Sequence, residues 1–241
     1  MKTLKQVEAT RKTYHHDPTI NTIHRASLLV PEIQNTTAEI SFLNHFLLKR
    51  QYSNVACKIT AIDTNGKKIK SKLHKIDKPA VYNFQLSGMV QESVSNYMVE
   101  FFSPDNLFIP FPAVMINHHG KNFINQVHAF NRVLNDVFED EEINSHQVKE
   151  ASIDLVVNED TDTFLLFNAG PLPCKDSLEI EVITPNETIK QKLDIDLPRF
   201  GTKKIEFKKT FKQLENGIRG IVKAKQPPQF LFYGRMLAGQ I

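Results

Sequence analysis

The side chains best suited to specific chemistry gather in one short stretch near the middle of the chain. Imidazole, amide and guanidinium groups form hydrogen bonds in defined directions, whereas an ordinary solvated face carries mostly Lys and Glu. The stretch therefore predicts either a polar contact surface between domains, which is the simpler interpretation, or a ligand site at a domain junction. Its members are Asn117, His118, His119, His128, Asn131, Arg132 and Asn135.

Two functions from different classes fit this cluster. The first is a non-enzymatic binding or assembly protein that recognises a protein partner or a small polar ligand there. The second is a hydrolase or metal-assisted enzyme in which His119 or His128 serves as base or metal ligand and Arg132 holds an anionic group. Adjacent residues 118 and 119 of a strand would point to opposite faces, so a divalent metal at His119 and His128 is the lesser alternative. No other cofactor is expected.

Other motifs with a known chemistry are missing from the sequence. It contains no GxSxG or HExxH motif and no glycine-rich phosphate loop, which argues against common hydrolases, zinc proteases and nucleotide-binding enzymes. Lysines concentrate in residues 67–78 and, at a related place in the second half, in residues 203–212. Arginine and interleaved aromatic residues are scarce there, so we interpret these lysines as protection of sheet edges and expect no nucleic-acid partner.

The elements that would position the cluster are β-strands in a repeated order. Residues 57–62 alternate and run into the turn 63–66, and residues 178–183 run in the same way into the turn 184–187. A Lys-rich alternating segment follows each turn, at 67–75 and at 189–197. This order predicts an all-β chain of two tandem antiparallel immunoglobulin-like β-sandwiches that arose by internal duplication. Because Trp is absent, the 17 Phe must fill most of the core.

One segment between the two halves has helical spacing. Phe123, Val127, Phe130, Leu134 and Val137 form an apolar stripe that predicts one amphipathic helix joining the sandwiches. The resulting domain prediction is an N-terminal arm over residues 1–31, a first sandwich over 32–119, a helical connector over 120–147 and a second sandwich over 148–241.

Composition places the chain among globular proteins. Its 241 residues are 41% hydrophobic and 24% charged, and the net charge of +3 is too small to indicate a nucleic-acid or membrane partner. No apolar run is long enough to span a membrane, and the first residues lack the apolar core of a secretory signal. Cys57 and Cys174 lie far apart, so free thiols in a cytoplasmic protein are expected. The sequence leaves the oligomeric state open.

Overall fold

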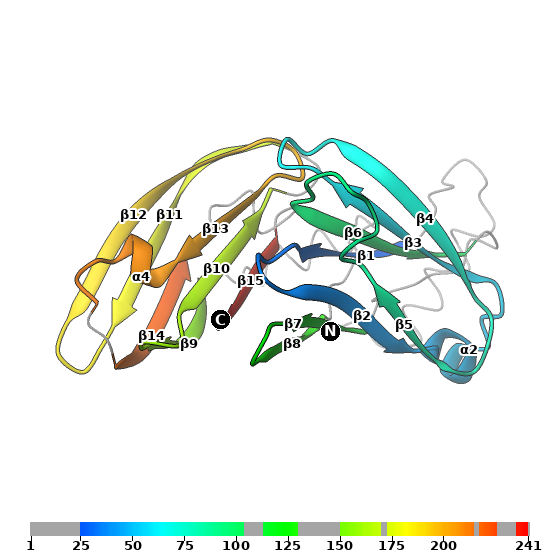
Figure 1. The fold of residues 1–241 in the computed structure, drawn as a ribbon, viewed down its shortest axis with the longest axis horizontal. Helices are drawn as coiled ribbons and strands as arrows, with labels where there is room; N and C mark the ends of the chain where they lie inside the picture. Colours follow the sequence, from blue (N-terminus) through cyan, green and yellow to red (C-terminus); the bar gives the residue numbers. More distant parts are fainter. Residues whose placement is uncertain are drawn as a thin grey trace, which may run out of the picture.

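The computed structural model describes residues 25–103, 113–129, 150–169, 173–214, 217–225 and 235–240. Within these ranges the chain forms four antiparallel sheets and two short helices, which confirms the all-β prediction. The sheets pack in pairs around two hydrophobic cores, and the two pairs form the arms of an arch (Figure 1).

The right-hand arm of Figure 1 is the first sandwich, built from sheets A and B. In the order of hydrogen-bonded neighbours, sheet A contains β1 (Arg25–Pro31), β6 (Asn96–Phe102), β3 (Val55–Ile62) and β4 (Lys68–Ile76). Sheet B contains β5 (Val81–Gln85), β2 (Thr37–Leu43), β7 (Val114–His119) and β8 (Ile124–Ala129). The short helix α2 (His45–Arg50) follows β2, and the side chain of Asn44 caps its N-terminus.

The left-hand arm is the second sandwich, built from sheets C and D. Sheet C contains β12 (Thr188–Leu197), β11 (Cys174–Ile183), β14 (Ile218–Lys225) and β9 (Glu150–Val157). Sheet D contains β13 (Thr202–Glu206), β10 (Thr163–Asn168) and β15 (Arg235–Gln240). A single helical turn, α4 (Phe207–Thr210), follows β13.

The two sandwiches have the same strand order. Counted from the first strand of each, sheets A and C both run 1-6-3-4, and sheets B and D share the order 5-2-7. Sheet B carries one more strand, β8, next to its seventh. The pairings of strand 2 with 5 and of strand 3 with 6 are those of a constant-type immunoglobulin domain, whereas strands 1, 4 and 7 lie in the opposite sheet. The strand order thus departs from the immunoglobulin order at three positions.

The predicted helical connector is wrong over residues 124–129, which form β8 and pair with β7. A bond from Gly120 N to Phe123 O closes the turn between these strands. Phe123 and Val127 have the i, i+4 spacing of a helix, but Phe123 lies in the turn before β8 and Val127 lies on the strand itself. Phe123 and Ile124 are 38% and 65% exposed and therefore do not form a core-facing stripe. The rest of the stripe, from Phe130 onward, lies outside the described residues.

The first sandwich also begins earlier than the expected boundary at residue 32. Strand β1 falls within the segment predicted to be an arm, and it pairs with β6 from Arg25 to Pro31. Leu28 and Val30 alternate with Leu29 on β1 and are buried in the core. The sequence does not show this alternation, because the outward-facing Leu29 is apolar like its two buried neighbours.

Phenylalanine supplies much of the large core volume, as predicted. Phe42, Phe46 and Phe101 lie together in the first core, where the rings of Phe42 and Phe101 meet edge to face at 4.9 Å. Phe207 and Phe211 stack at 5.0 Å in the second core. Each such ring contributes roughly 2–3 kcal/mol by leaving water.

The turn between β12 and β13 joins the two arms near the top of the arch (Figure 1). Phe200, in this turn, packs against Ile62 and Met98 of sheet A. Its carbonyl oxygen accepts a 2.8 Å hydrogen bond from Asn96 Nδ2 of β6. A second contact lies further along the sheets, where Ile33 of the β1–β2 turn packs against Phe164 and Leu166 of β10. These described contacts use residues other than the polar cluster that the sequence places at the junction.

Candidate polar binding face

The predicted site residues that the structure describes lie on two adjacent strands. Asn117, His118 and His119 are on β7, and His128 is on β8, where it pairs with Met115. As the alternation of a strand predicts, the adjacent histidines point to opposite faces: His118 is fully buried, whereas the His119 side chain is 40% exposed. The remaining members, Asn131, Arg132 and Asn135, lie outside the described residues.

The outward face of sheet B gathers three of these residues with others that the sequence analysis missed. Asn117 lies opposite Glu39 of β2 and Gln126 of β8, and His128 lies one row away on the same face. We call this set the polar face. Its members are Glu39, Ser41, Asn83, Asn117, His119, Gln126 and His128.

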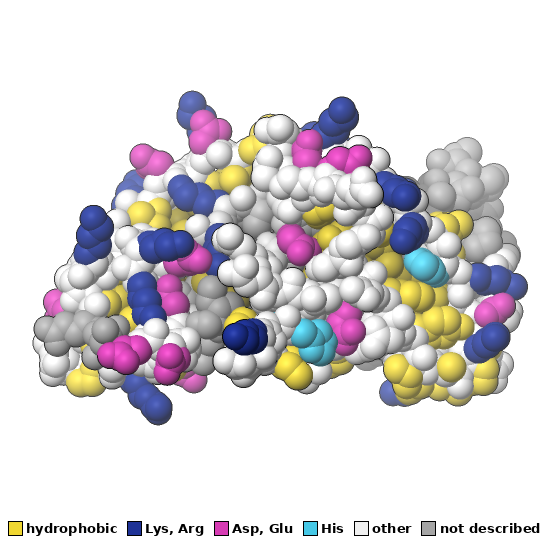
Figure 2. Space-filling view, in the orientation of Figure 1, with side chains coloured by type: hydrophobic (Ala, Val, Ile, Leu, Met, Phe, Trp, Pro, Cys, Tyr) yellow, Lys and Arg dark blue, Asp and Glu magenta, His cyan; other side chains and the backbone are white. Residues whose placement is uncertain are grey.

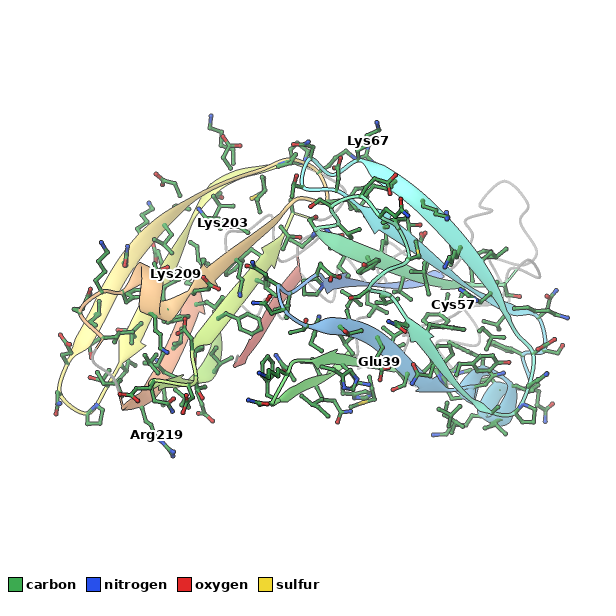
Figure 3. All side chains as sticks on the ribbon, in the orientation of Figure 1. Glu39, Cys57, Lys67, Lys203, Lys209 and Arg219 are labelled. Atoms are coloured by element: carbon green, nitrogen blue, oxygen red, sulfur yellow. The ribbon has the colours of Figure 1, made fainter. Side chains whose placement is uncertain are left out.

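Hydrogen bonds tie the polar face together across three strands. Gln126 Nε2 donates to Asn117 Oδ1 at 2.8 Å, and Asn117 Nδ2 donates to Glu39 Oε1 at 3.0 Å. His119 Nε2 lies 3.0 Å from the same carboxylate oxygen. Glu39 is thus the centre of the network, and Figure 3 marks its place on β2. These contacts fix the rotamers of the side chains, which preorganises them for a ligand.

Glu39 remains an anion at neutral pH. Burial alone would raise the pKa of its carboxyl group, but the contacts with His119, Asn117 and Asn83 outweigh burial and lower it. The polar face therefore presents one negative charge surrounded by amide and imidazole groups.

The equivalent face of the second sandwich is closed. Phe164 and Leu166 point outward from β10 in sheet D, yet they are 0% and 4% exposed because they pack at the contact with Ile33. On the first sandwich, by contrast, Gln126 and His128 of the extra strand β8 are exposed. Strand β8 therefore enlarges the face that stays open.

An apolar border lies at one end of the polar face. The ring of Phe123 lies against Gly120 in the β7–β8 turn, where a larger residue than Gly would collide with it. Phe123 and its neighbour Ile124 are exposed. This places an aromatic ring and a branched chain next to His119, which pairs with Ile124 in the register of the sheet.

His118 does not belong to the polar face. It points into the sandwich, and its Nε2 lies 2.9 Å from the carbonyl oxygen of Pro31 at the end of β1. Burial lowers the pKa of His118, so the imidazole is neutral and donates from Nε2 to that oxygen. Its role is to fasten sheet B to the end of sheet A.

Catalytic geometry is less developed than binding geometry at this face. The described partner of the Ser41 hydroxyl is an amide, Asn117 Nδ2, at 3.4 Å. Both cysteines are buried free thiols, and burial raises the pKa of each. Among the residues that the structure describes, no three His, Cys, Asp or Glu side chains are placed to hold a metal ion.

A sequence signal for the missed residues did exist. Thr37 to Phe42 alternate between polar and apolar residues, which puts Glu39 and Ser41 on one face of a strand. The pairing of β2 with β7 could not be predicted from the sequence, because the two strands are far apart in the chain.

No protein-family model matches this chain, and comparison with the curated proteins finds no similar sequence. Among the described residues, no helix is both long and apolar enough to cross a membrane.

Proposed function

We propose that this chain is a non-enzymatic binding protein whose polar face binds a small polar ligand rich in hydroxyl groups. The observation that carries the proposal is the network around Glu39, in which side chains from β2, β7 and β8 are held in fixed positions: Asn117 is buried within it, and Glu39 and Gln126 are accessible to solvent. Carboxylate, amide and imidazole groups supply both acceptors and donors, which a hydroxyl group needs. The exposed ring of Phe123 offers an apolar surface for the carbon face of such a ligand.

Binding of neutral oligosaccharides to the full chain tests this proposal, first on an array and then by calorimetry. Glu39→Gln should weaken binding about tenfold or more, because a hydrogen bond to a charged group contributes about 1.5–3 kcal/mol, and Gln126→Ala should weaken it about two- to tenfold, because a bond between neutral groups contributes about 0.5–1.5 kcal/mol. Glu181→Gln is the matched control, since Glu181 is a similarly exposed carboxylate that pairs with Lys190 on the other sandwich. Absence of binding to any oligosaccharide, or binding that Glu39→Gln leaves unchanged, would overturn the proposal.

The second candidate is a hydrolase or metal-assisted enzyme, and the close approach of His119 to Glu39 is what favours it. A carboxylate beside an imidazole orients the ring for proton transfer. A panel of chromogenic esters with and without EDTA tests this candidate. Turnover that His119→Ala abolishes while the melting temperature is retained would support the enzyme over the binding protein.

We also infer that the two sandwiches arose from one duplicated domain. The shared order of seven strands supports this inference, as does the equivalent position of the β3–β4 and β11–β12 hairpins. The hairpins are the segments whose similarity the sequence already suggests. Segments of residues 25–129 and 150–240 should then each fold when produced separately, which circular dichroism and urea unfolding would show.

A further inference from the structure

The open side of the first sandwich has a groove between two edge strands. In the described sheets β4 pairs with β3 alone and β5 with β2 alone, so both strands have an unpaired edge. The chain passes from one strand to the other at residues 77–80, which places both edges on the same side of the sandwich (Figure 1). The rings of His74 and Phe84 stack across the two sheets at 4.2 Å. We call the space along these edges the β4–β5 groove.

The groove is apolar along much of its length. Tyr82 and Phe84 of β5 pack on Phe42 of the core and are only partly buried. Leu73 and Val81 are 65% and 69% exposed and point outward at the two rims, because each alternates with an inward-facing neighbour. Figure 2 shows hydrophobic side chains gathered on this part of the right-hand arm. At the other end, the groove opens into a hollow of about 470 Å³ between the start of β4 and residues 88–92.

Lysine side chains lie on the inward face of β4, toward this groove. Lys70 pairs with Ala61 and Lys72 with Ile59, and both partners are core residues of β3. The two lysines therefore share the inward face with His74, yet both are exposed because β4 is an edge strand. Lys75 and Lys78 add positive charge nearby; the acidic groups on these segments are Asp77, which pairs with Lys75 at 3.2 Å, and Glu92.

The second sandwich shows that the fold does not require cations at these positions. At the equivalent register of β12, Ile189 pairs with Val182 and Gln191 with Ile180. The inward residues there are thus apolar or neutral, and Ile189 packs on the core. The lysines at 70 and 72 are a property of the first sandwich alone.

We propose that the β4–β5 groove binds an extended acidic segment of another protein, which pairs with the free edge of β5. In this arrangement the backbone of the segment completes the unpaired edge, as in other cases of strand addition. Alternate side chains of a strand share a face, so the inward face of the segment carries both the apolar side chains that cover Phe84 and Tyr82 and the carboxylates that meet the two lysines of β4. The positive charge selects an acidic partner over a neutral one. This surface is distinct from the polar face, so the proposal stands independently of the ligand proposed there.

The competing explanation is protection against self-association. Charged side chains that point inward on an edge strand keep two copies of a protein from pairing edge to edge. On that explanation, removal of the lysines makes the protein dimerise or aggregate, and an acidic peptide does not bind. The two explanations therefore differ in a measurable way.

The test uses the full chain and a fluorescent peptide with blocked termini, in which Ser alternates with Val over one half and with Glu over the other half, so that Val and Glu lie on the same face of the strand. Fluorescence anisotropy should show binding that weakens with added salt, since the contact is partly electrostatic. The double variant Lys70→Glu/Lys72→Glu should weaken binding at least about tenfold, whereas Lys190→Glu/Lys192→Glu on the equivalent strand β12 should leave it unchanged. A peptide with Gln in place of Glu should bind more weakly.

A second variant separates loss of binding from loss of fold. Val81 is largely exposed, so Val81→Asp should keep the melting temperature while placing a carboxylate on the rim where the acidic segment lies. It should weaken binding of the Val–Glu peptide, and Glu39→Gln should not. Lys70→Ala/Lys72→Ala removes the inward charges; if the peptide does not bind, or if this variant forms dimers in analytical ultracentrifugation with peptide binding unchanged, the proposal is overturned in favour of edge protection.

Discussion

Asn96 of the first sandwich and Asn168 of the second donate to the same two acceptors. The Nδ2 group of Asn96 lies 2.8 Å from Phe200 O and 3.2 Å from Thr202 Oγ1, and that of Asn168 lies 2.9 Å from each. Both amides are buried. The turn that carries Phe200 is therefore held from one side by its own sandwich and from the other by its neighbour.

Replacing Asn96 should loosen the arch more than it destabilises either sandwich. Asn96→Ala removes the described hydrogen bonds between the arms and should cost about 1–3 kcal/mol, because the acceptors stay buried. Small-angle scattering should show a broader distribution of distances between the arms. Asn168→Ala, the control, should lower the urea midpoint without that broadening. Identical scattering from wild type and Asn96→Ala would show that these hydrogen bonds do not set the angle between the two arms.

A second prediction concerns Gly66, whose turn lies near Lys67 at the top of the arch (Figure 3). Its φ is +76°, and a methyl group there would collide with the carbonyl oxygen of Arg199 in the second sandwich. Gly88 has a similar φ of +81° but open space around it. Gly88→Ala should therefore cost about 1–2 kcal/mol from backbone strain alone. Gly66→Ala should cost about 1–3 kcal/mol more in urea unfolding, since it also forces the arms apart. Equal losses of unfolding free energy for the two variants would mean that the turn moves away from Arg199 at no cost.

The buried imidazole of His118 should make stability depend on pH. Its pKa is lowered in the folded protein from the usual 6.5. As the pH decreases below about 6.5, the unfolded chain takes up the proton before the folded chain does. The free energy of unfolding therefore decreases, by up to about 1.4 kcal/mol for each pH unit of acidification. At higher pH the full stability is present. His118→Gln keeps a donor for Pro31 and should flatten this dependence in urea unfolding at several pH values.

Two other histidines, His45 and His74, also have a lowered pKa and contribute with the same sign. The decisive comparison is therefore the difference between wild type and His118→Gln, with exposed His128→Gln as control. A difference that does not change between about pH 7.5 and about pH 5.5 would contradict the assigned neutral state of His118.

Both thiols should be inert in the native protein. Cys57 and Cys174 are 0% and 1% exposed, and burial raises their pKa, so little thiolate is available to react. Ellman's reagent should label neither cysteine in buffer and both in denaturant. Rapid labelling of one thiol in buffer would show that its sandwich opens locally.

The local β-hairpins could be predicted from the sequence, and their partners could not. Asn65-Gly66 predicts a tight turn, and the structure places Gly66 at positive φ between β3 and β4. The equivalent hairpin β11–β12 was predicted in the same way. The expectation that the lysines of residues 203–212 lie at the place equivalent to residues 67–78 is wrong, because they lie on β13, on α4 and just after α4, whereas β12 is the counterpart of β4.

The candidate site was predictable in its residue types but not in its position. The opposite orientations of His118 and His119 follow from strand alternation alone. Their place relative to the second sandwich does not, because the contacts between the arms depend on Phe200 and Ile33, two apolar residues in turns that no periodic pattern marks. The predicted helical connector over residues 120–147 added to this error, because β8 is an edge strand of the first sandwich and not a link between domains.

The turn at Phe200 has a mechanical consequence. Phe200 adopts a φ of +58°, unusual for a residue with a bulky side chain, and its carbonyl serves both arms at one point. A small change of the backbone there is amplified along each arm, as displacement grows with distance from a pivot. A load applied at the far ends, where α2 and the β11–β12 hairpin lie (Figure 1), would act with the greatest leverage on this one turn.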